Sequence, residues 1–188
     1  MFVGREAELA KLESLYEQRS FQMAVVYGRR RVGKTTLINE FCRGKRTLSF
    51  TALEQSDADN LADFNRAIAS FFNLPTSIGG FSSWADVLSF IADRARTERF
   101  VFVFDEFPYA AMRNEALPSI FQVAIDRAFR ETNAFLILCG SNQGFMESNV
   151  LGRKSPLFGR RTAQIKVRDL GFRDAAKMLP GLSAQDAF

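Results

Sequence analysis

One stretch constrains this chain more than any other, and it reads Tyr-Gly-Arg-Arg-Arg-Val-Gly-Lys-Thr-Thr over residues 27–36. A glycine, four free positions and then Gly-Lys-Thr is the spacing of a P-loop, which binds phosphate through main-chain amides. An apolar run over residues 23–27 precedes the motif and has the β-branched content of a buried strand. Leu37, Ile38 and Phe41 follow it at helical spacing. The motif is therefore predicted to lie at a strand-to-helix turn.

The chemistry of the loop follows from that placement. Gly28 and Gly33 have no Cβ, so the backbone can approach an anion closely, and the positive end of the following helix adds to the attraction. We expect Lys34 to reach the β- and γ-phosphates and the Thr35 hydroxyl to ligate Mg²⁺, while Thr36 supports the first helical turn. The predicted nucleotide-binding residues are Gly28, Arg29, Arg30, Arg31, Val32, Gly33, Lys34, Thr35 and Thr36.

A second motif reads Phe-Val-Phe-Val-Phe-Asp-Glu over residues 100–106. Five continuous apolar residues indicate a strand buried on both faces, as in a parallel sheet, with two carboxylates where the strand emerges. This is a Walker B pattern. Asp105 is predicted to hold Mg²⁺, mostly through water, and Glu106 to act as general base toward the water that attacks the γ-phosphate. Taken alone, such a strand end is more often simply solvated, and the P-loop makes the functional interpretation the stronger one.

Another buried strand is predicted over residues 134–139, and it ends in Gly140-Ser141-Asn142. In a parallel sheet this end lies beside the predicted Walker B acids, so a polar side chain there is placed to hydrogen-bond the γ-phosphate or the attacking water. We choose Asn142 for this role, with Ser141 as the alternative. Gly-Ser-Asn is also ordinary turn chemistry.

Residues 152–168 carry six basic side chains and no acidic one. A solvated basic face is one interpretation of this stretch. The other is that the turn before a predicted strand at 162–167 places an arginine near the nucleotide edge, where it stabilises charge on the transferred phosphoryl group, in the same chain or from a neighbouring subunit. We choose Arg160 over Arg161 for that role.

The remaining segments predict supporting elements without a catalytic part. A short strand is expected over residues 46–51, and Asp57 and Ser83 are expected to cap two helices. Pro118 suits the first turn of a later helix. Apolar spacing predicts helices over residues 6–18, 57–71, 84–91, 117–128 and 171–179.

Composition narrows the possible classes of protein. With 188 residues and 47% apolar content, the chain is expected to form one globular domain over residues 1–188, with most of its 20 phenylalanines in the core. Histidine is absent from the sequence, which excludes histidine-dependent nucleophilic triads and histidine metal sites. Cys42 and Cys139 lie singly in apolar segments and are expected to be buried thiols in a reducing compartment.

Charge and hydropathy give two further expectations. The formal net charge of +4 suits a polyphosphate ligand and does not require nucleic acid. The first residues lack the apolar core of a signal peptide, and no apolar run approaches membrane-spanning length. We therefore expect a soluble cytoplasmic protein.

Several motifs taken together resemble a known family. They are Phe-Val-Gly-Arg-Glu at 2–6, the P-loop at 27–35, Phe-Asp-Glu-Phe-Pro-Tyr at 104–109, Gly-Ser at 140–141 and Leu-Phe-Gly-Arg-Arg-Thr at 157–162. In this order they resemble the archaeal-type P-loop ATPases of the STAND class, relatives of AAA+ and origin-recognition ATPases. The triple arginine and the Phe-Gly-Arg-Arg segment are the most family-specific pieces.

The resemblance implies a three-layer α/β sandwich with a five-stranded parallel sheet, an additional strand between the two Walker strands, and ATP as ligand. Members of the family usually continue into a helical lid, a winged helix and often a nuclease-like region. Because this chain ends at Phe188, we expect no C-terminal lid domain within it. We expect it to be the N-terminal part of a longer protein, with any DNA contact made by a domain outside this chain.

Three functions remain open on the sequence. The first is an Mg²⁺-dependent ATPase that binds ATP and ADP and acts as a nucleotide-dependent switch. A link to DNA and self-association with an arginine in trans are left open for it. The alternative is a non-hydrolysing, nucleotide-regulated module that binds DNA or protein through residues 152–168. A small-molecule kinase is the third, and the carboxylate of Glu106 directly after Asp105 argues against it because it favours activation of water.

Overall fold

A computed structural model describes residues 2–75, 80–172 and 174. Its centre is a parallel five-stranded sheet with the strand order β2-β3-β4-β1-β5. The strands are β1 (Gln22–Tyr27), β2 (Thr47–Thr51), β3 (Val101–Asp105), β4 (Phe135–Gly140) and β5 (Ala163–Lys166). Strand β4 lies between β1 and β3, which carry the two Walker motifs, so the predicted sheet with an additional strand is confirmed.

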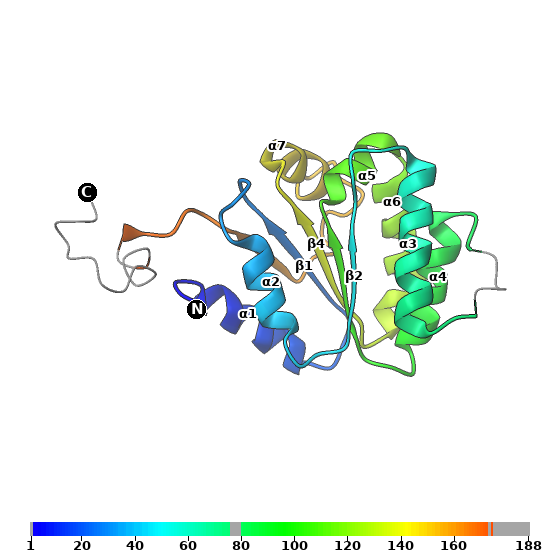
Figure 1. Ribbon diagram of the computed structural model, residues 1–188, viewed down its shortest axis with the longest axis horizontal. Helices are drawn as coiled ribbons and strands as arrows, with labels where there is room; N and C mark the ends of the chain where they lie inside the picture. Colours follow the sequence, from blue (N-terminus) through cyan, green and yellow to red (C-terminus); the bar gives the residue numbers. More distant parts are fainter. Residues whose placement is uncertain (1, 76–79, 173, 175–188) are drawn as a thin grey trace.

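Helices cover both faces of the sheet (Figure 1). On one face lie α1 (Glu6–Glu17) and α2 (Lys34–Cys42), and on the other lie α3 (Asp57–Phe72), α4 (Trp84–Ala95), α5 (Phe107–Arg113) and α6 (Leu117–Arg127). Shorter pieces are the 3₁₀ turn η1 (Phe129–Glu131), helix α7 (Gln143–Phe145) and the π-helical turn η2 (Met146–Val150). The three-layer α/β architecture is therefore as expected.

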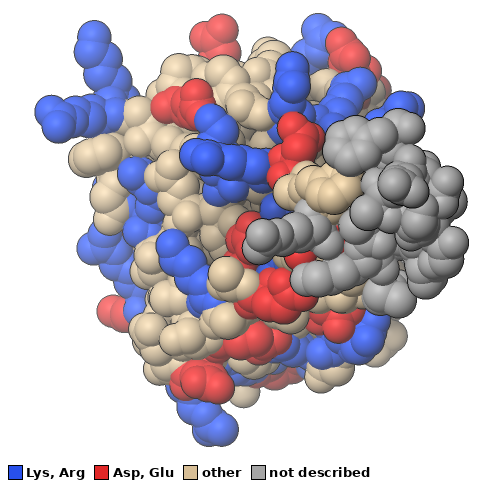
Figure 2. Space-filling model, turned by 90° about the vertical axis from the view of Figure 1, so that its left-hand side faces the viewer, with Lys and Arg blue, Asp and Glu red and all other residues tan. Residues whose placement is uncertain are grey.

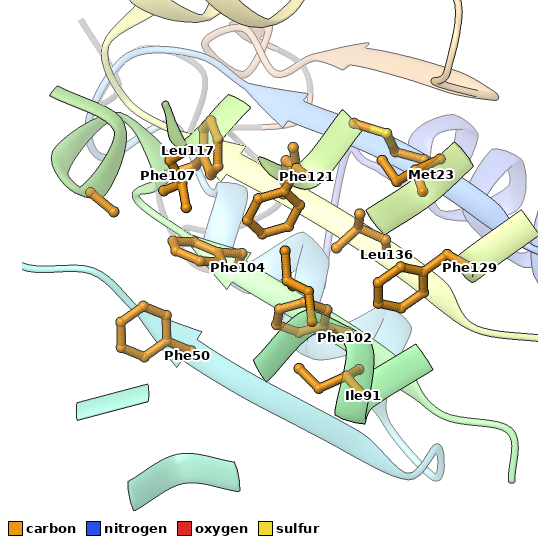
Figure 3. Packing of buried hydrophobic residues seen from close by; sticks show 14 of the residues in the cluster. Met23, Phe50, Ile91, Phe102, Phe104, Phe107, Leu117, Phe121, Phe129 and Leu136 are labelled. Atoms are coloured by element: carbon orange, nitrogen blue, oxygen red, sulfur yellow. The ribbon is translucent and has the colours of Figure 1, made fainter. Parts of the chain in front are cut away.

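The strands divide the core into two apolar layers because their side chains alternate between the faces. Phe102, Phe104 and Leu136 pack toward α3, α4, α5 and α6, while Val101 and Val103 pack toward α1 and α2. The larger layer is strongly aromatic, as Figure 3 shows. Of the 20 phenylalanines, Phe50 is 4% exposed and seven more pack, partly buried, against the two layers, while nine others are fully buried, so the prediction that most of this residue type is core is confirmed. The nine are each less than 2% exposed. They are Phe41, Phe64, Phe100, Phe102, Phe104, Phe107, Phe121, Phe129 and Phe135.

The helix starts agree with the sequence in one case and differ in another. Ser83 caps α4 by accepting a hydrogen bond from the Asp86 amide at 3.1 Å, as predicted. Helix α3 is capped by Ser56 and not by Asp57, because the Ser56 hydroxyl accepts from the Asp59 amide at 3.1 Å. The predicted helix over 171–179 falls almost wholly outside the described residues.

The Asp57 carboxylate has a different task from capping. It accepts hydrogen bonds from the Trp84 indole at 2.8 Å and from the Asn114 side-chain amide at 3.1 Å. These bonds tie the start of α3 to α4 and to the end of α5. Asp57, which was predicted to cap its own helix, therefore links three helices. The local sequence could not predict this role, because it depends on tertiary packing.

Parallel pairing sets the position of the site. Tyr27 of β1 lies opposite Gly140 of β4, and Phe104 of β3 lies opposite Leu138 of β4. The three strands therefore end level with one another, and the residues that follow them leave the sheet at one edge. This carboxyl edge is where ligands bind in open parallel sheets.

Candidate functional site

The P-loop connects β1 to α2 and needs both of its glycines. A Cβ on Gly28 would lie 2.2 Å from the Val167 carbonyl oxygen, so only glycine fits between the loop and the chain leaving β5. Gly33 has φ 91° and ends the loop just before α2, and its carbonyl accepts from the Leu37 amide at 3.0 Å. Arg31 also has a positive φ, 65°. These turns give the loop the curvature of an anion cradle.

Lys34 lies at the centre of this cradle and is only 7% exposed. Its Nζ donates to the carbonyl oxygens of Gly28 and Arg29, at 3.0 and 2.9 Å. The ammonium group is therefore held inside the loop, where its charge faces the space that phosphate oxygens occupy in a P-loop.

The carboxylates of Asp105 and Glu106, at the end of β3, accept hydrogen bonds from different residues. Asp105 is the last residue of the strand, and its Oδ1 accepts from the Glu106 amide at 2.9 Å. Glu106 has φ 49° and ψ 41°, a left-handed conformation that costs a non-glycine residue about 1–2 kcal/mol. Its Oε2 accepts from the amide and the hydroxyl of Ser141, at 3.0 and 2.9 Å. The carboxylate is thereby fixed at the end of β4.

Cys139 lies in the middle strand β4, beside Asp105. Burial raises the pKa of this thiol well above its ordinary value, and the nearby Asp105 carboxylate, to which the thiol is hydrogen-bonded, raises it further. The Lys34 ammonium acts on the same pKa in the opposite direction. The strand register, in which Tyr27 lies opposite Gly140 and Phe104 lies opposite Leu138, places the start of the loop and Asp105 at the same edge of the sheet. Cys42, in contrast, is partly exposed.

Two hollows open beside the loop. One, of about 310 Å³, lies against the end of β5 and is lined by Arg29, Val32, Gln143, Lys166, Val167, Arg168 and Asp169. The other, of about 340 Å³, lies against the ends of β3 and β4 and is lined by Arg30, Glu54, Glu106, Pro108, Tyr109, Ser141 and Asn142. A more apolar hollow of about 370 Å³ lies on the surface between α4 and α6, apart from these residues.

Asn142, predicted to contact the γ-phosphate or the water, lies at this edge, and its side-chain oxygen is hydrogen-bonded within its own turn. Its Oδ1 accepts from the Phe145 amide at 3.0 Å and caps the short helix α7. The alternative from the sequence, Ser141, is the residue that binds the Glu106 carboxylate. Both residues line the hollow of about 340 Å³.

Arg160 lies far from the loop, and the prediction that its turn reaches the nucleotide edge of the same chain is wrong. The residue precedes β5, and β5 is parallel to β1, so its turn lies at the amino edge of the sheet. The Arg160 Nε is 3.1 Å from both carboxylate oxygens of Asp126 in α6, and its Nη1 donates to the Pro156 carbonyl at 2.7 Å. This contact lowers the pKa of Asp126.

Arg161 is held at the same edge as Arg160. Its guanidinium lies 5.5 Å from the centroid of the Phe158 ring and donates to the Leu151 carbonyl at 3.3 Å. Neither of the two arginines considered from the sequence therefore faces the loop of its own chain.

Sequence reasoning missed the role of Arg5. This residue is 7% exposed, and its guanidinium donates to the Val32 carbonyl at 3.1 Å and to the Arg168 carbonyl. It therefore braces the P-loop against the segment that follows β5. The sequence shows this arginine only as part of the short segment Phe-Val-Gly-Arg-Glu before α1. Its hydrogen-bond partners lie 27 and 163 residues away, so the local sequence does not reveal them.

The donors at the edge fit a magnesium ion. Thr35 offers a hydroxyl and Asp105 a carboxylate, which are the hard oxygen ligands that Mg²⁺ prefers, and phosphate and water oxygens complete such sites. Asp105 is also held in place, since its Oδ1 binds the next amide. These two residues would hold the ion.

Surface charge is mixed around the molecule. On the face that Figure 2 shows, Lys and Arg side chains alternate with Asp and Glu. Within the basic stretch 152–168, Lys166 pairs with Glu147 at 2.8 Å and Arg160 pairs with Asp126. Among the described residues, no helix combines the length and apolar character that crossing a bilayer requires.

Solved structures resemble the fold. The Walker-type ATPase PABY2304 of Pyrococcus abyssi aligns with a TM-score of 0.65 at 21% identity, over 92% of this chain and 55% of that one. Cdc6p from Pyrobaculum aerophilum aligns with a TM-score of 0.59 at 19% identity, over 87% of this chain and 45% of that one. At these identities the likeness concerns the fold.

Curated relatives come from Methanocaldococcus jannaschii. One uncharacterized protein is 33% identical over 180 residues, which is 96% of this chain but 38% of the relative. An uncharacterized ATP-binding protein is 46% identical over 46 residues, 24% of this chain and 78% of the relative. The chain thus spans well under half the length of the first of these relatives. The model of an ATPase domain predominantly from Archaea matches residues 2–187, and because this is nearly the whole chain, the chain belongs to that family of P-loop ATPase domains.

Proposed function

We propose that this domain binds and hydrolyses ATP with Mg²⁺ at the carboxyl edge of its sheet. The observation that carries the proposal is that the loop holding Lys34 and the acids Asp105 and Glu106 leave neighbouring parallel strands at that same edge. The family of the chain and its ATP-binding relative support ATP as the nucleotide.

The loop would bind the phosphates through its main-chain amides and Lys34. The Lys34 ammonium would exchange its bonds to Gly28 O and Arg29 O for phosphate oxygens, since an ammonium group has three donors and no acceptor. Thr35 and Asp105 would hold Mg²⁺, which would supply positive charge to neutralise the phosphate oxygens. The buried position of Lys34 strengthens its attraction for the phosphates, because water screens it less.

Glu106 would activate the attacking water. Ser141 occupies Oε2 of this carboxylate, so we assign the water to Oε1. As the water oxygen forms its bond to the γ-phosphorus, a water proton passes to Glu106 and the bond from phosphorus to the β–γ bridging oxygen breaks. ADP leaves with that electron pair, and inorganic phosphate is the second product. Ser141 orients the base, and Asn142, in the same hollow, is the candidate for a contact to the γ-phosphate or the water.

We also propose a biological use for hydrolysis, namely a STAND- or AAA+-like switch. A partner or other parts of a longer protein would read its nucleotide state, and DNA-linked partners are included. The short coverage of the first relative is compatible with a longer protein. One observation favours a second candidate, a nucleotide-regulated binding module with negligible turnover. Two hydrogen bonds from Ser141 occupy Oε2 of Glu106, so that oxygen is already engaged and does not accept a proton from an attacking water.

Isothermal titration calorimetry with Mg·ATP and Mg·ADP tests the binding step. The parent chain is expected to release heat and saturate with one nucleotide per chain. Lys34→Ala is expected to bind at least about 100-fold more weakly, because it loses a charged contact inside the loop. Lys11→Ala, which removes an exposed lysine of α1, is the matched control and should bind as the parent does. Absence of heat in the well-folded parent would contradict the proposal.

A further inference from the structure

The three arginines of the P-loop point to different places. Arg29 lines the hollow beside β5, whereas Arg30 lines the hollow beside the ends of β3 and β4. Arg31 is exposed at a left-handed position of the loop, with φ 65°. The three consecutive side chains therefore cannot share one role, and only the second of them lies in the hollow that also contains Glu106.

Helix α5 holds Arg30 in this position. The Arg30 guanidinium donates through Nη2 to the phenolic oxygen of Tyr109. Tyr109 lies in the first turn of α5, and its amide donates to the Glu106 carbonyl at 2.9 Å. The same turn of chain therefore positions the candidate base and the arginine across one hollow of about 340 Å³.

The place of this hollow relative to the phosphates is fixed by the loop. On the proposed function, Lys34 and the start of α2 bind the phosphates, and Glu106 activates the water that attacks the γ-phosphorus. Arg30 belongs to the loop and lines the same hollow as Glu106. A guanidinium there is next to the end of the triphosphate that reacts. Arg29, on the β5 side, is not.

Among the described residues, neither arginine considered from the sequence supplies a guanidinium at this place. Phosphoryl transfer develops negative charge on the γ-phosphate oxygens that an arginine stabilises. Arg160 and Arg161 lie at the amino edge, bound to Asp126 and stacked on Phe158. Arg30 carries five N–H donors, of which the bond to Tyr109 uses one, so the others remain for phosphate oxygens.

We propose that Arg30 is a catalytic residue that contacts the γ-phosphate and stabilises its developing charge within the same chain, with Tyr109 as its positioning residue. This inference rests on the proposed hydrolysis of ATP. The stabilising charge then comes from the loop itself, so turnover does not require an arginine from a second copy.

The test compares variants of the chain in steady-state phosphate release and in binding. Arg30→Ala is expected to lower kcat about 100-fold, near the cost of removing one donor from a preorganised anion site. Its affinity for ADP should change by less than threefold, while its affinity for ADP with aluminium fluoride, a mimic of the transferring phosphoryl group, falls about as far as kcat. Arg30→Lys should recover part of the rate.

Two further variants separate charge from position. Tyr109→Phe keeps the guanidinium but removes its tether, so a decrease in kcat of about tenfold with unchanged ADP affinity is expected. Arg113→Ala, which removes an exposed arginine from the other end of α5, is the matched control and should retain the parent rate. The rate per chain should also stay constant as the protein is diluted, because Arg30 acts in cis.

The results that would overturn the role of Arg30 differ from those that would contradict ATP hydrolysis itself. If the parent hydrolyses ATP and Arg30→Ala retains kcat within threefold, this inference is overturned while the ATPase proposal stands. Equal losses of affinity for ADP and for the aluminium fluoride complex would also overturn it, because the arginine would then bind the ground state only. A parent chain that binds no nucleotide contradicts the proposed function itself.

Discussion

Glu106 and Ser141 are joined at a single oxygen: Glu106 Oε2 accepts from the Ser141 amide at 3.0 Å and from its hydroxyl at 2.9 Å. The two residues lie 35 positions apart, at the ends of the neighbouring strands β3 and β4. Glu106 also has a left-handed backbone, with φ 49°. The candidate base is thus held by its own main chain and by the next strand, as a preorganised catalytic group must be.

Removing the Ser141 hydroxyl tests whether this hold orients the base. Ser141→Ala keeps the hydrogen bond from the backbone amide to Glu106 but loses the one from the hydroxyl. We expect kcat for ATP hydrolysis to fall about tenfold while the affinity for ATP stays within threefold. Ser148→Ala, whose hydroxyl binds the Gly144 carbonyl in a nearby turn, is the control. Faster turnover in Ser141→Ala would contradict the orienting role, because it would show that Ser141 restrains Glu106.

Gly28 gives a prediction about stability. A Cβ at this position would lie 2.2 Å from the Val167 carbonyl oxygen, so Gly28→Ala forces the loop away from β5. We expect the free energy of unfolding, measured with urea, to fall by about 1–3 kcal/mol through overpacking, in addition to lost nucleotide binding. Gly44→Ala is the matched comparison, since it has a positive φ but open space around its Cβ, and about 1 kcal/mol is expected there. Equal losses in both variants would contradict the packing argument.

The pair of Arg160 and Asp126 predicts a dependence on pH. A hydrogen bond from Arg160 is the largest cause of the lowered pKa of Asp126, so the folded state favours the carboxylate. The stabilisation is therefore fully present above the unfolded pKa of about 3.9 and is lost as the pH falls through the lowered folded value. Asp126→Asn is expected to cost less than about 1 kcal/mol at pH 7, since the pair is partly solvated.

Urea unfolding of the parent and Asp126→Asn at several pH values checks this. The difference in unfolding free energy should shrink below about pH 4 as Asp126 takes up its proton. Asp86→Asn is not a suitable control, because Asp86 takes part in the cap of α4. Asp93→Asn, which loses a long surface contact to Arg96 at 3.8 Å, is the better one. A difference that is constant down to pH 2 would contradict the assigned pair.

The fold was largely predictable because its signals are local. The glycine spacing of the P-loop can be recognised within a few residues. The same is true of the apolar runs at 23–27, 100–104 and 134–139, which a parallel sheet buries on both faces. The bonds that complete the site are long-range. Ser141 meets Glu106 across 35 residues, and Arg5 meets Val32 across 27. Such pairs depend on how the elements pack.

The error at Arg160 has a different cause. A strand was expected over residues 162–167, and β5 spans Ala163–Lys166. A turn that precedes a parallel strand lies at the amino edge, opposite the edge where the P-loop and the acids emerge. Strand direction alone was therefore sufficient to exclude this turn from the site of its own chain. The Tyr109 hydroxyl, which holds Arg30, gave no sequence signal, because it lies 79 residues away.

The most direct measurement of the central claim is steady-state release of inorganic phosphate from Mg·ATP by the parent chain and by Glu106→Gln, with the ATP affinity of both measured in parallel. The variant keeps the size of the side chain and removes its basicity, so we predict that phosphate release falls at least about 100-fold while ATP affinity stays within threefold. Equal phosphate release by the two proteins would contradict the account of this edge as a hydrolytic site.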